Sequence, residues 1–329
     1  MQTKEILIAG KFDDEAFSLL KSEPGFVVKN VPFDLTAVDL STVNALAIRS
    51  RTKINDALLD RAPNLEVIVT ATSGFDHIDY GEAVRRGITV MFAPGANVES
   101  AAQHTWAHVL ALTNMIIKAD GLMRSGEWTR QPLHGFLTGT ELSGKTYGIV
   151  GLGRIGCRVA QFANCFNMRV IAYDPYCKED QFEKVRARKV SYKEILAQSD
   201  FLSFHVPSTE ETFHMVGQTE IELMKPGVFL INTCRGTVFS ETEICKGLRN
   251  KKIAGLGLDV FEKEPLPQDS ELFDFPNVIL TPHTGANTFE AFEKSGAQTA
   301  QKIIAFLRNG ISSDTLPPQE TWYKKVPTA

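Results

Sequence analysis

Short apolar segments alternate with amphipathic segments along the first third of the chain. The apolar segments are four or five residues long and are bounded by turn residues, as is typical of strands. They cover residues 6–9, 45–48, 65–69 and 88–92. Between them, residues 14–22 and 55–61 carry apolar side chains at helical spacing. This alternation predicts βα units arranged around a parallel sheet.

A longer helical pattern extends from about Val98 to Ser125. Trp106, Val109 and Leu112 belong to an apolar set that leaves this segment little polar surface. We therefore expect the helix to be buried against another domain or subunit. Residues 126–144, which follow it, are polar and rich in turn residues, so they are predicted to link two modules.

From Lys145 onward the alternation restarts. Six strand candidates follow, at residues 147–150, 169–173, 201–204, 228–231, 254–258 and 278–280. Helical segments separate most of them, at residues 155–166, 192–197, 218–224 and 241–249. Six strands in this arrangement fit one doubly wound nucleotide-binding domain. A last helix is predicted at about 288–307, before a Pro-rich tail.

The second module begins in mid-chain, so we predict that it is inserted into the first and that the last helix returns to the first. The predicted fold class is α/β, with two Rossmann-like, doubly wound parallel-sheet domains. Residues 1–97 and 289–329 are expected to form a flavodoxin-like substrate-binding domain. Residues 98–288 are expected to form the nucleotide-binding domain.

Composition narrows the class of protein. A chain of 329 residues is long for a single core, which supports two domains. The hydrophobic fraction of 43%, the charged fraction of 22% and the net charge of −4 fit a globular protein without a broad nucleic-acid surface. No apolar run approaches the roughly 18 residues that span a bilayer, and the N-terminus lacks a signal-peptide pattern. The five cysteines show no paired spacing, so we expect free thiols and a cytoplasmic location.

A glycine-rich motif follows the first strand of the second module. Gly151, Gly153 and Gly156 form the pattern GxGxxG at the start of a predicted helix. In a dinucleotide site the first glycine permits a tight turn, the second lets the backbone approach a pyrophosphate, and the third allows close helix–strand packing. The helix N-terminus adds unpaired N–H groups for the phosphates. The motif alone is weak, but its position between strand and helix favours a dinucleotide cofactor.

Asp174 ends the next predicted strand, roughly 20 residues after this turn. A carboxylate there accepts hydrogen bonds from the ribose hydroxyls of NAD and repels the 2′-phosphate of NADP. The alternative is a strand-ending aspartate that only shapes the turn before Pro175. The basic run at residues 184–189 is more typical of a solvated face than of a 2′-phosphate site. The predicted cofactor is NAD.

Polar residues also follow three later strands, where an α/β sheet binds its ligands. Arg235, Glu264 and His283 are the candidates for catalysis. Arg235 is suited to bidentate binding of a substrate carboxylate. His283 is suited to exchange a proton near neutral pH, and Glu264 to orient its imidazole. Taken singly, each could be an ordinary loop residue; their common position at successive strand ends favours hydride transfer at C2 of a 2-hydroxy acid.

With these motifs, the chain resembles the D-isomer-specific 2-hydroxyacid dehydrogenase family over essentially its whole length. The matching stretches are residues 73–79, 151–156, 232–236, 258–265 and 282–288. The catalytic arginine, glutamate and histidine of the family fall on Arg235, Glu264 and His283. The cofactor contacts that the resemblance implies fall on Gly151, Gly153, Arg154, Ile155, Gly156, Asp174, Val206, Thr233, Cys234, Asp259 and Gly285. The resemblance also implies an active site in the cleft between two domains, and a homodimer formed through the helix that begins at Val98.

Within the family, the likeness is greatest to the phosphoglycerate dehydrogenases, in a short form without a C-terminal regulatory domain. Residues 286–288 favour this group, which implies oxidation of D-3-phosphoglycerate to 3-phosphohydroxypyruvate, the first step of serine biosynthesis. The substrate contacts are expected at Arg49, Ser50, Ser73, Gly74, Arg235 and His283. However, Thr70 stands where some of these enzymes carry an arginine, which weakens the case for a phosphate site. A basic loop around Arg49 that only contacts solvent or Asp56 is the structural alternative.

Three other functions are weighed. The first is a hydroxypyruvate, glyoxylate or other 2-keto acid reductase, and the second, less favoured, is a formate dehydrogenase, which resembles this chain but has glutamine in place of Glu264. The third is an NAD-sensing corepressor without essential catalysis. No metal is expected, because no trio of histidines has ligand spacing. His104 and His108 lie four residues apart on one helix, and we expect them to pack at an interface.

Overall fold

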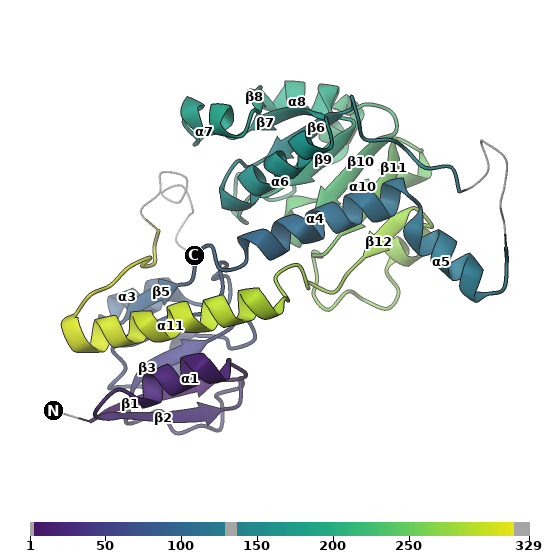
Figure 1. Cartoon of the computed structure of the whole chain (residues 1–329). Coiled ribbons are helices and arrows are strands. Elements are labelled where there is room, and N and C mark those ends of the chain that lie inside the picture. Colours follow the sequence, from purple (N-terminus) through teal and green to yellow (C-terminus); the bar gives the residue numbers. More distant parts are fainter. Residues whose placement is uncertain (1–2, 129–136, 319–329) are drawn as a thin grey trace. The chain divides into compact units, whose positions relative to one another are not determined.

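The structure is a computed structural model, and it describes residues 3–128 and 137–318 (Figure 1). Residues 129–136 of the predicted link and residues 319–329 of the Pro-rich tail lie outside the described residues. The chain divides into two compact units, residues 1–97 with 287–329, and residues 98–286. The second transition lies two residues before the predicted 288/289 boundary, because Thr288 is already the N-cap of the last helix.

Unit 1, residues 1–97 with 287–329, is built on a five-stranded sheet with the order β2-β1-β3-β4-β5. All four strand pairs are parallel, and this order is that of flavodoxin-like folds. The strands are β1 (Lys4–Ala9), β2 (Phe26–Val31), β3 (Val43–Ile48), β4 (Val67–Thr70) and β5 (Thr89–Phe92). The helices are α1 (Asp14–Lys21), α2 (Asp56–Leu59), α3 (Tyr80–Arg85) and α11 (Phe289–Asn309).

Alternate residues of β1 enter two different cores in unit 1. Ile6 and Ile8 pack with buried residues of α1 and α11, whereas Leu7 packs on the other face with residues of α2 and α3. A strand that is covered on both faces reads as a continuous apolar run, which is why the first strand was visible in the sequence. Figure 1 shows α1 and α11 side by side over this sheet.

Unit 2, residues 98–286, is built on a seven-stranded parallel sheet with the order β12-β11-β10-β9-β6-β7-β8. Its strands are β6 (Thr146–Val150), β7 (Arg169–Tyr173), β8 (Arg188–Lys189), β9 (Phe201–Phe204), β10 (Val228–Asn232), β11 (Ile253–Leu258) and β12 (Val278–Leu280). Its α-helices are α4 (Val98–Thr113), α5 (Ile116–Arg124), α6 (Arg154–Cys165), α7 (Glu179–Lys184), α8 (Tyr192–Gln198), α9 (Gln218–Leu223) and α10 (Glu241–Arg249). Unit 2 also contains the 3₁₀ turns η1 (Gly236–Val238) and η2 (Glu271–Asp274). The predicted α/β class with two parallel sheets is confirmed.

Predictions for five single elements were incomplete or wrong. The edge strand β2 was missed, because Lys29 and Asn30 interrupt its apolar pattern. Unit 2 has a seventh strand, β8, which contains only two residues. The short helices α3 and α7 were also missed. The long helix expected at 98–125 is divided, because Met115 has a left-handed φ of 57° and separates α4 from α5.

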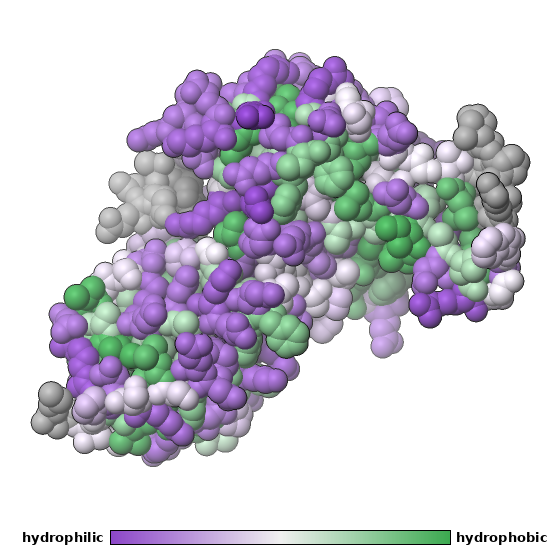
Figure 2. Space-filling view, in the orientation of Figure 1, coloured by the Kyte–Doolittle hydropathy of each residue, from purple (hydrophilic) through white to green (hydrophobic). Residues whose placement is uncertain are grey.

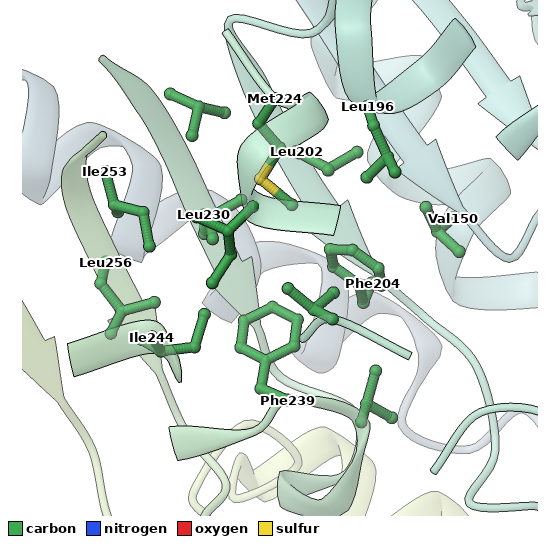
Figure 3. Packing of buried hydrophobic residues seen from close by; sticks show 14 of the residues in the cluster. Val150, Leu196, Leu202, Phe204, Met224, Leu230, Phe239, Ile244, Ile253 and Leu256 are labelled. Atoms are coloured by element: carbon green, nitrogen blue, oxygen red, sulfur yellow. The ribbon is translucent and has the colours of Figure 1, made fainter. Parts of the chain in front are cut away.

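The core of unit 2 places large side chains of the central strands against the helices on one face of the sheet (Figure 3). Phe204 of β9 and Phe239 make an edge-to-face pair with ring centroids 4.9 Å apart. Leu230 of β10 and Leu256 of β11 are fully buried beside them. Because packed interiors resist rearrangement, this core fixes the carboxyl ends of β9, β10 and β11 relative to one another.

Hydrophilic residues cover most of the face shown in Figure 2, and apolar residues lie among them, including over α5. None of the helices in the described ranges is both long enough and apolar enough to cross a membrane.

Candidate functional site

The glycine-rich turn follows β6, where the strand order of unit 2 reverses between β9 and β6. Gly151 has a left-handed φ of 90°, and a Cβ there would lie 2.6 Å from the carbonyl oxygen of His205. A Cβ on Gly156 would lie 2.0 Å from the carbonyl oxygen of Gly151. Both positions therefore exclude side chains, for the packing reason expected of a dinucleotide motif.

Gly153 differs from these two glycines. A Cβ on Gly153 would meet nothing within 4 Å, so open space lies beside the start of α6. Gly153 is the N-cap of α6 and gives no side-chain hydrogen bond to the first N–H groups of the helix. Arg154 is exposed and Ile155 is half-buried at the same end. Space, unpaired N–H groups and a helix dipole are what a pyrophosphate requires, so these residues fit a dinucleotide.

Asp174 is fixed at the end of β7, beside the glycine-rich turn. Its Oδ2 accepts a hydrogen bond of 2.8 Å from the backbone N–H of Leu152. Its Oδ1 accepts from the N–H groups of Tyr176, at 2.9 Å, and Cys177, at 3.1 Å. The carboxylate is therefore oriented before any ligand binds, and it remains half-buried rather than enclosed. Val206, after β9, borders the same turn, with its Cγ1 2.9 Å from where a Cβ on Gly151 would lie.

A buried asparagine shapes the segment that carries Arg235. Asn232, the last residue of β10, is fully buried, and its amide nitrogen donates to the carbonyl oxygen of Arg235 at 2.9 Å. Its amide oxygen accepts from the N–H of Cys234 at 3.0 Å. Thr233 pairs through its hydroxyl with that of Thr105 of α4, at 2.8 Å. This turn holds Arg235, whose Nη1 donates to the carbonyl oxygen of Cys234 at 2.7 Å.

His283 and Glu264 form an ion pair at the ends of β12 and β11. The Nδ1 of His283 lies 2.8 Å from Oε2 of Glu264, and the two side chains are 52% and 39% exposed. The Oε1 of Glu264 accepts a further hydrogen bond from the N–H of Phe261 at 3.2 Å. With Nδ1 engaged by the carboxylate, Nε2 is the nitrogen that remains for a substrate.

The charges at this site alter the pKa values of both partners. The hydrogen bond to Glu264 raises the pKa of His283 above its ordinary value, against an opposing effect of burial and of Arg235. Burial acts to raise the pKa of Glu264, but His283, the N–H of Phe261 and the charge of Arg235 together lower it below its ordinary value. Arg235 acts on both groups, so the guanidinium, the carboxylate and the imidazole lie together in unit 2.

Asp259 follows β11, and its carboxylate accepts hydrogen bonds from the turn that contains His283. Its Oδ1 accepts from the N–H of Thr284 at 2.8 Å, and its Oδ2 accepts from the N–H of Gly285 at 2.8 Å. The Thr281 hydroxyl donates to Oδ1 at 2.6 Å. Burial acts to raise the pKa of Asp259, but its hydrogen bonds, that of His104 foremost, lower it. The carboxylate is thus held in its charged form.

Two histidines that the sequence analysis expected to pack at an interface lie near this site instead. His104 of α4 has its Nε2 3.1 Å from Oδ1 of Asp259 and 2.9 Å from Oγ1 of Thr281. His108, one turn further along, has its Nε2 3.0 Å from the same hydroxyl. The two histidines pack inside unit 2 against Thr281. Their four-residue spacing was the only signal in the sequence, and it does not identify the partner.

The substrate residues predicted in unit 1 have structural partners. Nη2 of Arg49 donates to Ser295 Oγ at 2.9 Å and to the carbonyl oxygen of Phe292 at 3.2 Å. The Phe292 ring also lies 4.3 Å from the guanidinium. Ser73 donates to the side chain of Asn97 at 2.7 Å, next to Gly74. Ser50 is exposed.

Across residues 3–128 and 137–318, the His, Cys, Asp and Glu side chains form no group of three or more that could hold a metal ion. His134 lies outside the described residues.

Comparison with known proteins identifies close relatives. A sequence profile of the D-isomer specific 2-hydroxyacid dehydrogenase NAD-binding domain matches residues 106–285. A glyoxylate reductase of Thermococcus litoralis is 42% identical over 272 residues, which are 82% of this chain and 82% of that protein. A D-3-phosphoglycerate dehydrogenase of Bacillus subtilis is 39% identical over 82% of this chain but only 50% of its own length.

Solved structures agree with the sequence comparison. The crystal structure of D-lactate dehydrogenase from Aquifex aeolicus, complexed with NAD and lactic acid, superposes with a TM-score of 0.81. It is 31% identical in sequence, and the match covers 92% of this chain and 95% of that chain. A glyoxylate reductase from Paecilomyes thermophila superposes with a TM-score of 0.86 at 26% identity, over 96% of this chain and 99% of that one.

Proposed function

Since the chain belongs to the D-isomer-specific 2-hydroxyacid dehydrogenase family, we propose that Arg235, Glu264 and His283 carry out its reaction, the interconversion of a small D-2-hydroxy acid and its 2-keto acid. The observation that carries this proposal is the 2.8 Å contact between His283 Nδ1 and Glu264 Oε2, with the charge of Arg235 acting on both groups. An acid–base group and a carboxylate-binding cation are what this reaction requires of the protein.

The three side chains have separate tasks in the proposed mechanism. Arg235 binds the substrate carboxylate through its forked N–H groups. In the oxidative direction, Nε2 of His283 takes the proton of the C2 hydroxyl, and Glu264 stabilises the imidazolium that forms. In the reductive direction, the protonated His283 returns a proton to the carbonyl oxygen. The nicotinamide dinucleotide, when bound, accepts the hydride from C2 or supplies it.

The residues that would hold the dinucleotide are those of the glycine-rich turn and Asp174. Gly153 and the N-terminus of α6 face the phosphates in this proposal, and Asp174 accepts from the ribose hydroxyls. A fixed negative charge at this position disfavours a 2′-phosphate, so NAD is preferred to NADP. What supports this preference is the orientation of the Asp174 carboxylate by three backbone N–H groups.

For the substrate, we favour a small 2-keto acid of the glyoxylate or hydroxypyruvate class. Two observations support this choice. Glyoxylate reductases from several archaea match this chain over most of both lengths. In addition, Arg49 is engaged by Ser295 and Phe292 of α11, so its guanidinium has less capacity for a substrate phosphate.

D-3-Phosphoglycerate stays a second candidate. Two D-3-phosphoglycerate dehydrogenases match at 37% and 39% identity, and residues 286–288 resemble that group. Arg51 and Lys53 add positive charge beside Arg49 in the same loop. A role in serine biosynthesis would require that D-3-phosphoglycerate is the substrate. The cytoplasmic location is a separate prediction.

We further expect a homodimer formed through α4 and α5. Ile116, Ile117 and Met123 of α5 are 51%, 62% and 52% exposed, which is unusual for large apolar side chains on one short helix. A second copy of the chain is the partner that the resemblance implies.

A substrate panel tests the function. Purified protein is assayed with NADH and glyoxylate, hydroxypyruvate, pyruvate or 3-phosphohydroxypyruvate, and with NAD and the corresponding hydroxy acids. We expect turnover of glyoxylate or hydroxypyruvate with NADH. Preference for the phosphorylated pair would move the assignment to phosphoglycerate. If none of these acids is turned over, the proposed enzymatic activity is refuted and the corepressor function is favoured.

Two variants test the catalytic residues. His283→Ala should lower turnover by about 10²- to 10⁴-fold, the usual contribution of general acid–base catalysis, while NADH binding measured by fluorescence is retained. Arg235→Lys should mainly raise the KM of the keto acid, because an ammonium group cannot replace the fork. Near-normal turnover of His283→Ala would show that another group transfers the proton.

A further inference from the structure

The backbone at His283 is held in an uncommon conformation. Its φ is 54°, a left-handed value that is unfavourable for a residue with a Cβ. The N–H of His283 donates to the carbonyl oxygen of Thr281 at 3.0 Å, and the next two N–H groups donate to Asp259. The turn 281–285 keeps its shape because Asp259 accepts these hydrogen bonds, and this shape directs the imidazole to Glu264.

The single proton of the Thr281 hydroxyl determines which histidine atoms must donate hydrogen bonds to it. The hydroxyl of Thr281 has one proton, which it gives to Oδ1 of Asp259 at 2.6 Å. The Nε2 atoms of His104 and His108, at 2.9 and 3.0 Å from the same hydroxyl oxygen, must therefore donate to it. Both imidazoles are thus protonated at Nε2. Burial lowers the pKa of His108 to about 4, which agrees with a neutral ring.

His104 has a second partner that His108 lacks. Its Nε2 also lies 3.1 Å from Oδ1 of Asp259, so one N–H is shared between the hydroxyl and the carboxylate. Asp259 has a side chain only 2% exposed, and His104 is 20% exposed. A buried carboxylate keeps one orientation only if its donors are in place, and His104 supplies the donor that comes from α4. These hydrogen bonds therefore connect helix α4, through Asp259, with the turn that contains His283.

We propose that His104 is a positioning residue for the reaction: by donating to Thr281 and Asp259, it holds the turn 281–285 so that His283 faces Glu264. The proposal rests on the proposed role of His283. Within the described part of the chain, His104 forms no hydrogen bond or ring contact with Glu264 or His283, so its effect is transmitted through Asp259. The groups that act on His283 are Glu264, Arg235 and Asp259. Those around His104 are Asp259, Thr281 and His108, whose ring centroid lies 4.9 Å away.

Three variants test the proposal. His104→Leu removes the donor, His104→Gln keeps an N–H donor near the same place, and Gln103→Leu changes the exposed neighbour as a control. We expect His104→Leu to lower kcat for keto-acid reduction by up to about 100-fold, the loss that a displacement of about 1 Å can cause. The thermal unfolding midpoint should change little. His104→Gln should recover most of the lost turnover, and Gln103→Leu should behave as the wild type.

An NMR titration separates failure of this proposal from failure of the proposed function. The His283 imidazole should titrate at lower pH in His104→Leu than in the wild type, because the contact with Glu264 that raises its pKa is loosened. This readout does not require turnover. If no acid is turned over but the His283 titration moves, the function is wrong and the positioning is right. If the titration is unchanged in His104→Leu, the proposal is overturned.

A double variant provides a further check. His104→Leu combined with Thr281→Val should lose no more turnover than the worse single variant, because both changes break the same chain of hydrogen bonds. Losses that multiply would show that the two residues act separately and would contradict the proposal. Equal losses in His104→Leu and His104→Gln would contradict it as well.

Discussion

At residue 283, two different carboxylates act on one histidine. Glu264 contacts the imidazole and raises its pKa, whereas Asp259 accepts hydrogen bonds from the two backbone N–H groups that follow it. The side chain and the main chain are thus oriented by separate groups, both at the end of β11. This division allows the proton affinity of His283 and its position to be tested by different substitutions.

The first prediction concerns the proton affinity of His283. Reduction needs a protonated imidazole, so the reductive kcat/KM should fall as pH rises through the raised pKa of His283, and oxidation should show the opposite trend. Glu264→Gln removes the negative charge that raises this pKa. The decline of reductive kcat/KM should then occur at lower pH, as measured by pH–rate profiles. Glu262→Gln is the control, because Glu262 pairs with His214 at 3.1 Å, and equal profiles for Glu264→Gln and wild type would refute the role.

The second prediction concerns the choice of dinucleotide. Asp174→Ala should raise the KM for NAD by about 10- to 100-fold, because hydrogen bonds to a charged acceptor contribute roughly 1.5–3 kcal/mol. The preference for NAD over NADP should narrow, since the charge that repels a 2′-phosphate is gone. Asp180→Ala, which removes an exposed carboxylate paired with Lys184, is the control. An unchanged NAD/NADP ratio would leave Asp174 with a purely structural role at Leu152.

Among single residues, the sequence predicted the candidates that follow strands. It did not predict a role for His104, which lies in a helix. Arg235, Glu264 and His283 were found because the carboxyl ends of neighbouring parallel strands share one edge of a sheet. Their roles stay predictions. His104 lies in a helical pattern whose apolar positions suggested burial, and a sequence does not say that its partner is Thr281, far along the chain.

At the scale of elements, the turn from β6 into α6 contains two glycines that are needed for different reasons. Gly156 is required for packing, because a Cβ would lie 2.0 Å from the carbonyl oxygen of Gly151. Gly153 is not required for packing, since its Cβ would meet open space. The third prediction follows from this difference.

Gly156→Ala should lower the free energy of unfolding by about 1–3 kcal/mol, as overpacking does, whereas Gly153→Ala should leave it nearly unchanged. Gly153→Ala should still lose NADH affinity, because the added methyl group occupies the space assigned to the pyrophosphate. Denaturant unfolding and NADH fluorescence measure the two effects. Gly121→Ala in α5, where a Cβ also meets nothing, is the control. If Gly153→Ala binds NADH normally, the phosphates do not lie at this turn.

Elements covered on both sheet faces were predicted well, and short or peripheral ones were not. β6 and β9 are buried along their whole length, β1 and β3 are buried along most of theirs, and all four are mostly apolar, so their patterns are clear. β2 lies at a sheet edge with polar residues, and β8 is too short to form a pattern. The break at Met115 was not predictable, because methionine is an ordinary helix residue and its left-handed conformation is imposed by the surroundings.

For the whole molecule, the expected homodimer gives the fourth prediction. Ile117, 62% exposed on α5, lies in the surface assigned to the second copy. Ile117→Glu places a charge in that apolar interface, so it should shift the protein from dimer to monomer in light scattering after size-exclusion chromatography. Phe273→Glu, at a 56% exposed apolar position elsewhere in unit 2, should remain dimeric. A wild-type monomer, or a dimer unaffected by Ile117→Glu, would exclude this interface.

The arrangement of unit 1 has a consequence for the order in which the protein acquires its structure during synthesis. Ala300 and Ile303 of α11 cover Ile6, Ile8 and Val67, yet they leave the ribosome only after the whole of residues 98–286. At the usual elongation rate of 5–20 residues per second, that delay is roughly 10–40 s. Throughout this delay, one face of the nascent five-stranded sheet is covered by α1 but lacks α11. The contiguous unit 2 can therefore complete its core before unit 1 completes the core that contains α11.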